Sequence, residues 1–336
     1  MMPIDNNRLF VKIARLYYEQ DLTQSEIAEK LRLSRQKVQR LLQQAKEQGI
    51  VQINIRPVMG AFSELEAALE QRFNLREAVV VETTSFEDQH IVAREVGAGA
   101  AEYLMRIVQS QESIVISWGG SLLGVVNTLS AGPLRNDLQG IKVIQGLGGL
   151  GNPNKEVHAA DLTRRLAQML GGEAVLLPTP AVAGTREARD AFFDDPFVSQ
   201  VLVQARTAKL AMMGIGTPRL DSILMREGKI VSWEELEALK HLGAVGDINL
   251  RFFNEWGKLT PSSLDERVIG LTLDEIRKID QVVGVAGGAA KVHAIHGALV
   301  GRLVDVLVTD HVTARQLLDS VESENSSYDQ SLVIKQ

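Results

Sequence analysis

The segment GVAGGAAKVHAIHGALVGRLVDVLVTD, residues 284–310, points to the fold class of most of the chain. An apolar run ends in two glycines, Lys291 follows, and a helical pattern leads to a second apolar run, DVLVTD. A strand, a glycine turn, a helix and a second strand are the repeating unit of α/β proteins. Because the unit recurs throughout that class, the segment alone leaves open whether Lys291 reacts, holds a ligand or caps a helix.

The alternation of strands and helices extends over residues 57–320. Apolar runs predict strands at residues 77–82, 112–117, 141–146, 173–180, 208–216, 243–253 and 305–310. Helical patterns separate them, and one of these helices begins with a capping box formed by Ser232 and Glu235. We expect an α/β domain with a mostly parallel sheet and helices on both faces, followed by a frayed tail over residues 321–336.

The first 56 residues follow a different pattern, that of a helix-turn-helix. Thr23 and Glu26 form a capping box at the start of one short helix, and Ser34 is a good N-cap for the next. The turn between the two helices has the three-to-four-residue length that this motif requires. Residues 50–57, IVQINIRP, alternate like a strand. We therefore expect a winged helix-turn-helix domain over residues 1–56.

The charge distribution favours DNA as the partner of this domain. The chain carries a net charge of −6, but residues 1–56 hold ten Lys and Arg against six Asp and Glu, a balance of +4 that leaves −10 on the rest. Residues 31–46 contain five basic side chains and no acidic one. A basic surface on an acidic protein is typical of a DNA-binding module. An ordinary helical hairpin with a charged, solvated face is the alternative.

Helical spacing separates the inner and outer faces of the helix that follows Ser34. Apolar Val38, Leu41, Leu42 and Ala45 fall on the inner face. Arg pairs with guanine and Gln with adenine in the major groove, whereas Lys and Thr side chains suit phosphates. The expected DNA contacts are Thr23, Gln24, Ser34, Arg35, Gln36, Lys37, Gln39 and Arg40.

Turns at the carboxyl ends of the expected strands carry the candidate ligand-binding residues. Ligands of parallel sheets bind at this edge, and glycine turns before helices offer backbone N–H donors to a phosphate. The candidates are Gly119, Gly120, Ser121, Gln145, Gly214, Gly216, Asp247 and Lys291. Anion-binding amides, one cation and one carboxylate together suit a phosphorylated sugar or polyol. Taken singly, each glycine turn is also explained by tight packing, Asp247 by capping and Lys291 by a solvated surface position.

The order of these motifs resembles the SorC family of bacterial sugar-responsive transcription regulators. The similarity rests on LTQSEIAEKLRLSRQKVQRLLQQAKEQGIVQINI, ISWGGSL, GIGTP, GDI and the segment at residues 286–310, and it spans nearly the whole chain. The resemblance implies a winged-helix DNA-binding domain, an effector domain of the phosphosugar-isomerase-like α/β fold, operator DNA as partner, and a homo-oligomer. It also implies that residues 119–121 and Lys291 hold a phosphate and that Asp247 holds sugar hydroxyls, with Gln145 a weaker transfer.

A sugar-phosphate isomerase or deaminase is the rival function. Such enzymes use a carboxylate base and a lysine, and Asp247 with Lys291 supplies both groups. An isomerase would gain nothing evident from a DNA-binding domain, so we expect a sensor without catalysis. A protein that coats nucleic acid would need a more extensive basic surface.

Composition narrows the protein class further. The absence of cysteine excludes disulfides, thiolate catalysis and cysteine-ligated zinc, and it fits a reducing cytoplasm. No uncharged apolar run approaches the ~18 residues of a transmembrane span, and the N-terminus lacks the apolar core of a signal peptide. We expect a cytoplasmic protein with no cofactor, no metal and no membrane partner.

Overall fold

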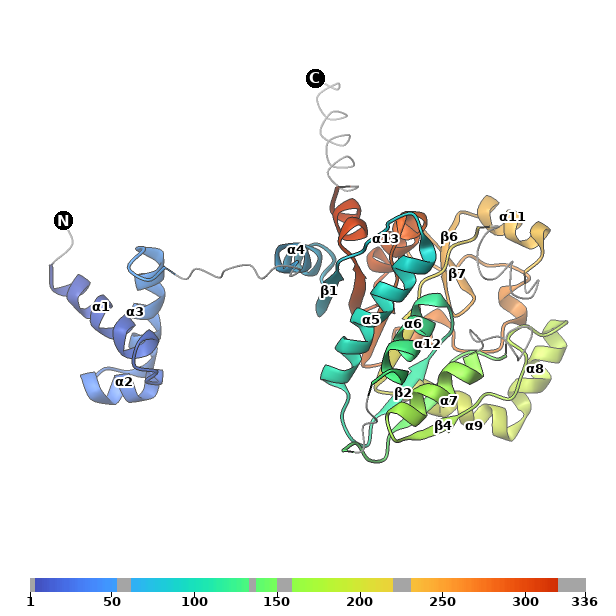
Figure 1. Cartoon of the computed structure of the whole chain (residues 1–336), viewed down its shortest axis with the longest axis horizontal. Coiled ribbons are helices and arrows are strands. Elements are labelled where there is room, and N and C mark those ends of the chain that lie inside the picture. The colour runs from blue at the N-terminus through green and yellow to red at the C-terminus, as the bar shows by residue number, and fades with distance from the viewer. Residues whose placement is uncertain (1–3, 53–61, 133–136, 150–158, 220–230, 320–336) are drawn as a thin grey trace, which may run out of the picture. The chain divides into compact units, whose positions relative to one another are not determined.

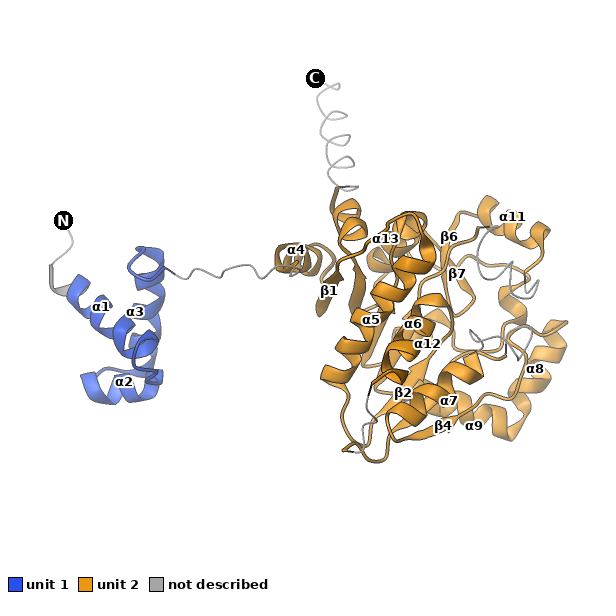
Figure 2. Cartoon of the chain, in the orientation of Figure 1, with its two compact units in different colours: residues 1–58 blue, residues 59–336 orange. Residues whose placement is uncertain are grey.

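The computed structural model describes residues 4–52, 62–132, 137–149, 159–219 and 231–319. The chain divides into two compact units, residues 1–58 and 59–336, coloured separately in Figure 2. This division falls two residues after the boundary expected at residue 56. The strand of the expected wing, from residue 53 onward, and the expected tail at residues 321–336 lie outside the described residues.

The described part of unit 1 is a bundle of α1 (Ile4–Tyr18), α2 (Gln24–Leu31) and α3 (Arg35–Glu47). The expected capping box forms at α2, where the Thr23 hydroxyl accepts from the Glu26 N–H and the Glu26 carboxylate accepts from the Thr23 N–H. At α3 the Ser34 hydroxyl accepts from the Lys37 N–H at 3.2 Å. Both helix starts are therefore encoded locally, as the sequence predicts.

One apolar core holds the three helices of unit 1 together. The inner faces of α1, α2 and α3 supply its fully buried side chains, among them Ile13, Ile27 and Val38. Burying side chains of this size contributes about 1.5–3 kcal/mol each, which offsets the low intrinsic stability of helices as short as α2. Packing of the inner faces leaves the polar faces of α2 and α3 exposed.

Unit 2 is built on a seven-stranded sheet with the order β1-β9-β8-β5-β2-β3-β4, in which every neighbouring pair is parallel. Its strands are β1 (Glu77–Val81), β2 (Ser113–Ile116), β3 (Lys142–Gln145), β4 (Glu173–Val175), β5 (Leu210–Gly214), β8 (Gln281–Val285) and β9 (Val306–Asp310). The expected α/β class is confirmed.

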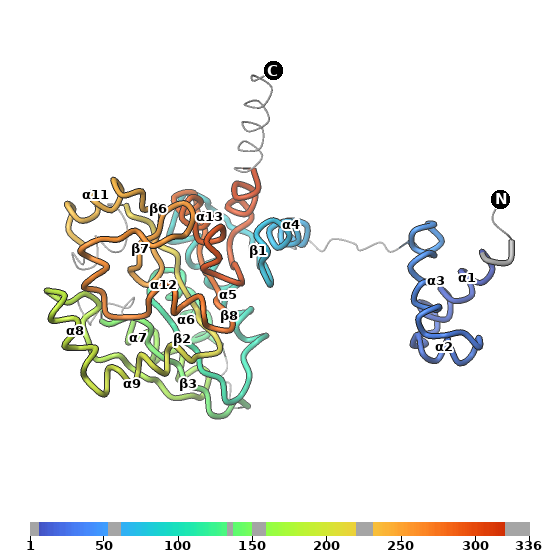
Figure 3. The backbone as a smooth tube through the Cα atoms, turned by 180° about the vertical axis from the view of Figure 1, so that it is seen from behind, coloured from blue at the N-terminus to red at the C-terminus, as the bar shows by residue number. Residues whose placement is uncertain are grey.

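Helices cover both faces of this sheet (Figures 1 and 3). Among the described residues of unit 2, the helices with given bounds are α4 (Ser63–Phe73), α5 (Gln89–Ile107), α6 (Gly120–Ser130), α7 (Ala159–Met169), α8 (Arg186–Asp194), α9 (Pro196–Arg206), α11 (Trp233–His241), α12 (Leu273–Ile276) and α13 (Val292–Val300), and residues 311–319 are also helical. Successive strand residues point to opposite faces: Ile114 packs in a cluster with α5, α6 and α7, whereas Val115 packs in one with α4, α12 and α13.

The chain order of the sheet reverses between β2 and β5. From β2 the chain adds β3 and β4 on one side, and from β5 it adds β8 and β9 on the other. Crossover connections therefore leave in opposite directions at the carboxyl ends of these two central strands, which opens a crevice there. The loops that follow β2 and β5 meet at this crevice.

The prediction of one strand over residues 243–253 is wrong in form. This segment is an antiparallel hairpin of β6 (Ala244–Ile248) and β7 (Arg251–Asn254), separate from the main sheet and packed beside α11 (Figures 1 and 3). Its turn residues, Asn249 and Leu250, have φ angles of 58° and 61°. Two left-handed residues make the tight turn that suits strand twist, and Asn tolerates this conformation well.

Candidate functional site

The surface expected to contact DNA lies on α2 and α3. Arg35, Gln36, Gln39 and Arg40 are exposed on the side of α3 opposite its buried residues, as predicted. Lys37 is exposed as well, and Gln24 is partly exposed. The side chains expected to read the groove therefore share one accessible helix face, the arrangement in which a helix-turn-helix enters the major groove.

Two of the expected DNA contacts have their hydroxyls engaged in capping. The Thr23 hydroxyl donates to the Glu26 carboxylate at 2.7 Å and accepts from the Glu26 N–H, so its one hydrogen is already used. Ser34 accepts from the Lys37 N–H but keeps its hydrogen for another acceptor. Ser34 therefore retains a donor for a phosphate, whereas Thr23 shapes the start of α2.

A cavity of about 950 Å³ occupies the crevice at the carboxyl ends of β2 and β5. Its lining includes residues 118–121 after β2, residues 214–217 after β5, Asp247 and Asn249 of the β6–β7 hairpin, and residues 289–291 after β8. The sequence analysis placed the candidate site at this same edge of the sheet, on the basis of the glycine turns at strand ends. The structure thus brings together at one cavity Gly119, Gly120, Ser121, Gly214, Gly216, Asp247 and Lys291.

The turn after β2 presents unsatisfied donors to this cavity. Gly119 adopts a φ of 118°, which only glycine tolerates well, and it begins α6 without a side-chain cap. Ser121, in the first turn of α6, is 3% exposed, and its hydroxyl has no hydrogen-bond partner in the described chain. A helix start with uncapped N–H groups and a buried hydroxyl is suited to an anion.

Asp247 contributes a buried carboxylate. Its Oδ2 accepts from the Leu250 N–H at 3.2 Å, and its Oδ1 has no partner in the described residues. Burial raises the pKa of Asp247 to about 6, although the Leu250 N–H and the nearby Lys291 lower it. Near neutral pH the side chain is an ionised acceptor with one oxygen available for a ligand hydroxyl.

Lys291 stands at the start of α13, after the turn that leaves β8, as the sequence predicts. The side chain is partly exposed at the cavity wall and makes no ion pair with a described residue. Burial lowers the pKa of Lys291 to about 8, while Asp247 raises it. The lysine therefore remains a cation at neutral pH, in electrostatic contact with Asp247.

Gln145 lies elsewhere. Its amide nitrogen donates to the Leu147 carbonyl at 2.7 Å, and its amide oxygen accepts from the Leu177 N–H at 3.2 Å. Both polar atoms thereby connect β3 to neighbouring loops, and the residue is not part of the cavity lining. A side chain with both ends used inside the fold has nothing left for a ligand, so we leave Gln145 out of the candidate site.

The cavity includes residues that the sequence did not single out. Residues 86–90, together with Ala93 and Arg94 of α5, form one wall, and Trp118 and Asn249 line another part. The Asn249 side chain also accepts from the Ser117 hydroxyl and donates to the Gly146 carbonyl, which ties the hairpin to the strand ends. Residues 86–90 follow β1, whose carboxyl end lies at the same edge of the sheet. Their position after a predicted strand could therefore have identified them from the sequence.

A helix-turn-helix unit joined to a unit with a small-molecule cavity defines the class of effector-controlled transcriptional regulators. The family model of a sugar-binding domain matches residues 59–319, and the Sigma-70 region 4 model matches residues 12–48. Within the described residues, no helix is long and apolar enough to cross a membrane.

Proteins that are similar over nearly the whole chain are also named as regulators. The chain is 32% identical to the deoxyribonucleoside regulator of Bacillus subtilis over 95% of its own length and 100% of the relative's. It is 32% identical to the sorbitol operon regulator of Klebsiella pneumoniae, over 94% and 98% of the two lengths. The crystal structure of full-length SorC from Klebsiella pneumoniae matches with a TM-score of 0.69 and 30% identity, over 94% of this chain and 99% of that one. This protein belongs to the SorC family of sugar-responsive transcriptional regulators.

Proposed function

We propose that the effector of this regulator is a phosphorylated sugar or polyol bound in the cavity of unit 2. The observation that carries the proposal is the pair of buried, unpartnered oxygens, the Ser121 hydroxyl and Asp247 Oδ1, on the wall of a cavity that Lys291 also lines. In this arrangement, residues 119–121 and Lys291 hold the phosphate, and Asp247 accepts from a sugar hydroxyl.

Electrostatics supports the placement of the phosphate between Lys291 and the start of α6. Lys291 is the residue directly before α13, where its charge opposes the positive end of the helix dipole. A dianionic group between Lys291 and the uncapped start of α6 relieves that conflict and supplies an acceptor for the Ser121 hydroxyl. Leaving a buried donor or acceptor unsatisfied costs roughly 1–3 kcal/mol, so a ligand that satisfies both oxygens gains binding free energy.

The two glycines at the end of β5 are consistent with a ligand in the cavity, because they have no side chain that would occupy it. Gly214 and Gly216 line the cavity, and Gly216 pairs with Asp247 through two backbone hydrogen bonds. The Gly216 N–H donates to the Asp247 carbonyl at 2.8 Å, and the Asp247 N–H donates to the Gly216 carbonyl at 3.1 Å. This bridge fixes the carboxylate against the loop that follows β5, at the centre of the crevice.

Control of DNA binding follows from linkage. A ligand changes operator affinity only by binding more tightly to one arrangement of the DNA-reading helices than to another. One recognition helix reads too few bases for operator-level specificity, so we infer a homo-oligomer on inverted half-sites. Sedimentation should give at least a dimer in the cytoplasmic protein, and a monomer that protects one half-site would contradict this assembly.

The alternative, a sugar-phosphate isomerase, is favoured by one observation. Asp247, with a pKa near 6, and Lys291, with a pKa near 8, have the values of an acid–base pair that works at neutral pH. The named relatives are regulators, and we propose that the pair binds rather than reacts. Incubation with aldose and ketose phosphates should give no interconversion above the no-protein control.

The effector assignment is tested with a panel of sugar phosphates, each paired with its unphosphorylated sugar. At least one phosphate should raise the melting temperature while its sugar does not, because ligands stabilise by RT ln(1 + [L]/Kd). Lys291→Ala should abolish that shift and leave DNA affinity without effector unchanged. Lys278→Ala, which removes an exposed lysine after α12, is the matched control and should keep the full shift. Undiminished affinity of Lys291→Ala in calorimetry would contradict the assignment.

A further inference from the structure

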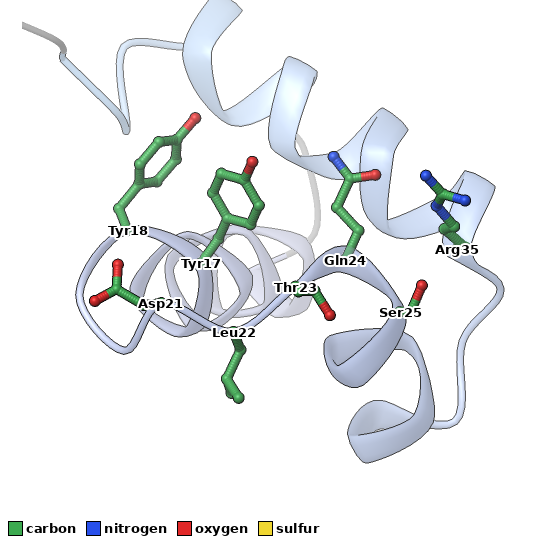
Figure 4. A pocket seen from close by; sticks show the side chains of 8 residues that line it. All are labelled: Tyr17, Tyr18, Asp21, Leu22, Thr23, Gln24, Ser25 and Arg35. Atoms are coloured by element: carbon green, nitrogen blue, oxygen red, sulfur yellow. The ribbon is translucent and has the colours of Figure 1, made fainter. Parts of the chain in front are cut away.

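A groove in unit 1 runs between the end of α1, the start of α2 and the start of α3. Its volume is about 560 Å³, and its walls are Tyr17, Tyr18, Asp21, Leu22, Thr23, Gln24, Ser25 and Arg35. Figure 4 shows the hydroxyls of both tyrosines, the Gln24 amide and the Arg35 guanidinium pointing to the same side. Three of the expected DNA contacts, Thr23, Gln24 and Arg35, thus line the same groove as two aromatic residues from α1.

The two tyrosines hold each other in place through their rings. Their ring centroids are 4.9 Å apart at an interplanar angle of 83°, an edge-to-face contact. The Lys46 ammonium, near the end of α3, lies 6.0 Å from the centre of the Tyr18 ring. Neither hydroxyl has a hydrogen-bond partner in the described chain, so both are available to a molecule outside it.

The side of α3 that borders the groove is basic and amide-rich. Arg35 lines the groove and Lys46 contacts Tyr18, so the stripe of α3 that joins them faces the end of α1. Gln39 follows Arg35 by four residues and falls on the same stripe. Asp21, the acidic side chain of the lining, lies at the end of the groove away from Arg35 in Figure 4.

We propose that this groove seats the phosphodiester backbone of one DNA strand, with the Tyr17 and Tyr18 hydroxyls donating hydrogen bonds to its phosphate oxygens. The proposal rests on the DNA-binding function of unit 1 and extends the contact surface to α1. In helix-turn-helix complexes the helix before the recognition helix crosses the backbone, and phosphate contacts fix the register of the reading helix. The tyrosine pair would thereby set the depth at which Arg35 and Gln39 meet the bases.

Hydroxyl-deletion variants test the proposal in the full-length protein. The probe is a duplex of about 30 base pairs with arbitrary sequence, titrated by fluorescence anisotropy over a series of salt concentrations. Tyr17→Phe and Tyr18→Phe together should weaken binding about tenfold for any sequence, since hydrogen bonds to charged groups are among the strong ones. The slope of log affinity against log salt concentration should not change, because tyrosine is neutral, whereas Lys37→Ala, which removes an exposed cation expected to contact a phosphate, should reduce that slope by about one.

The matched control is Tyr103→Phe, in α5 of unit 2, whose hydroxyl accepts from the Gln281 amide. It removes a tyrosine hydroxyl and should leave DNA affinity unchanged. The phenylalanine rings keep the packing of the pair, so the melting temperature of the double variant should match that of wild type. Wild-type affinity in the double variant would overturn the proposal, as would a loss confined to one sequence or a loss that tracks a fall in melting temperature. Failure of the wild type to bind any duplex would instead contradict the DNA-binding function.

Discussion

The α-carbon of Gly216 lies directly against the carboxylate of Asp247. A β-carbon on Gly216 would stand 2.1 Å from Asp247 Oδ1 and 3.0 Å from Cγ. The carboxylate has little room to withdraw, because Asp247 is buried and its other oxygen accepts from the Leu250 N–H. The absence of a side chain at residue 216 is therefore a condition for the position of Asp247.

Gly216→Ala should displace this carboxylate. Overpacking of a buried site costs about 1–3 kcal/mol, so we expect the free energy of unfolding to fall by that amount in urea titrations. Calorimetry should show at least a tenfold loss of affinity for the sugar phosphate that gives the largest thermal shift. Gly184→Ala is the control, because a β-carbon there meets nothing within 4 Å and its φ is not left-handed. Equal behaviour of the two variants would contradict the steric argument.

The raised pKa of Asp247 should appear in the pH dependence of stability. Between the ordinary value of 3.8 and about 6, the carboxyl is ionised in the unfolded chain but protonated in the folded one. The folded state then binds more protons, so this group's stabilisation is present below about pH 4 and is lost as the pH rises to about 6. At about 1.4 kcal/mol per pKa unit, the loss is on the order of 3 kcal/mol at most.

Asp247→Asn removes this titration. The difference in unfolding free energy between variant and wild type should therefore shift in favour of the variant as the pH rises from about 4 to 6. Comparing the two proteins by urea titration cancels the carboxylates that they share. Lys291 has the opposite dependence, since its lowered pKa gives a stability that increases with pH between about 8 and 10.5. A variant-minus-wild-type difference that is constant from pH 4 to 6 would refute the assigned pKa direction.

Features that depend on a few neighbouring residues could be read from the sequence. The Thr23–Glu26 and Ser232–Glu235 capping boxes and the Ser34 cap form as expected, because each joins a side chain to a backbone N–H three residues away. The strand-end glycine turns also indicated the right edge of the sheet. Parallel strands with right-handed crossovers bring their carboxyl ends to one side, whatever their order.

Features that depend on long-range contacts could not be read in this way. Leu250 occupies a left-handed turn position where glycine is usual, so residues 243–253 gave no sign of a hairpin. Gln145 stands at a strand end like the other candidates, but its amide is drawn away by the Leu177 N–H, 32 residues along the chain. Residues from 86 to 94 line the cavity because the strand order β1-β9-β8-β5-β2 determines where the segment after β1 lies. No local sequence pattern encodes that order.

DNA reading by α3 should depend on its outermost side chains. Gln36→Ala or Arg40→Ala should weaken operator binding by roughly 1–3 kcal/mol and relax base preference, because each removes a side chain that we expect to contact a base through two hydrogen bonds. Gln43→Ala is the control, since Gln43 is exposed on the same helix but donates to Glu47 at 3.1 Å. Gel shifts at one fixed salt concentration, with operator and with unrelated DNA, measure both quantities. Full affinity and full specificity in both variants would show that other residues read the bases.

Phe62, the first described residue of unit 2, contacts His311 through its ring. The two rings are stacked, with centroids 5.1 Å apart at an interplanar angle of 13°. His311 follows Asp310, whose buried Oδ2 accepts from the Gly288 N–H at 2.9 Å, three residues before Lys291. Phe62 directly precedes α4, on the chain that arrives from unit 1. One hydrogen bond and one ring contact thus connect the turn before α13, where Lys291 lies, to that chain.

Phe62→Ala should weaken communication between the sites more than either binding event. The effector's influence on DNA affinity is a coupling free energy, which is carried by packed contacts with two arrangements. We expect the ratio of DNA affinities with and without the sugar phosphate to fall severalfold, while effector affinity without DNA stays within about twofold. Phe197→Ala, which removes a ring that is 75% exposed, should leave that ratio unchanged.

His311→Ala should lower the ratio as well, and the double variant should lose no more than either single one, because both changes break the same contact. An unchanged ratio in Phe62→Ala would exclude this contact as the route, and additive losses in the double variant would show that the two residues act separately.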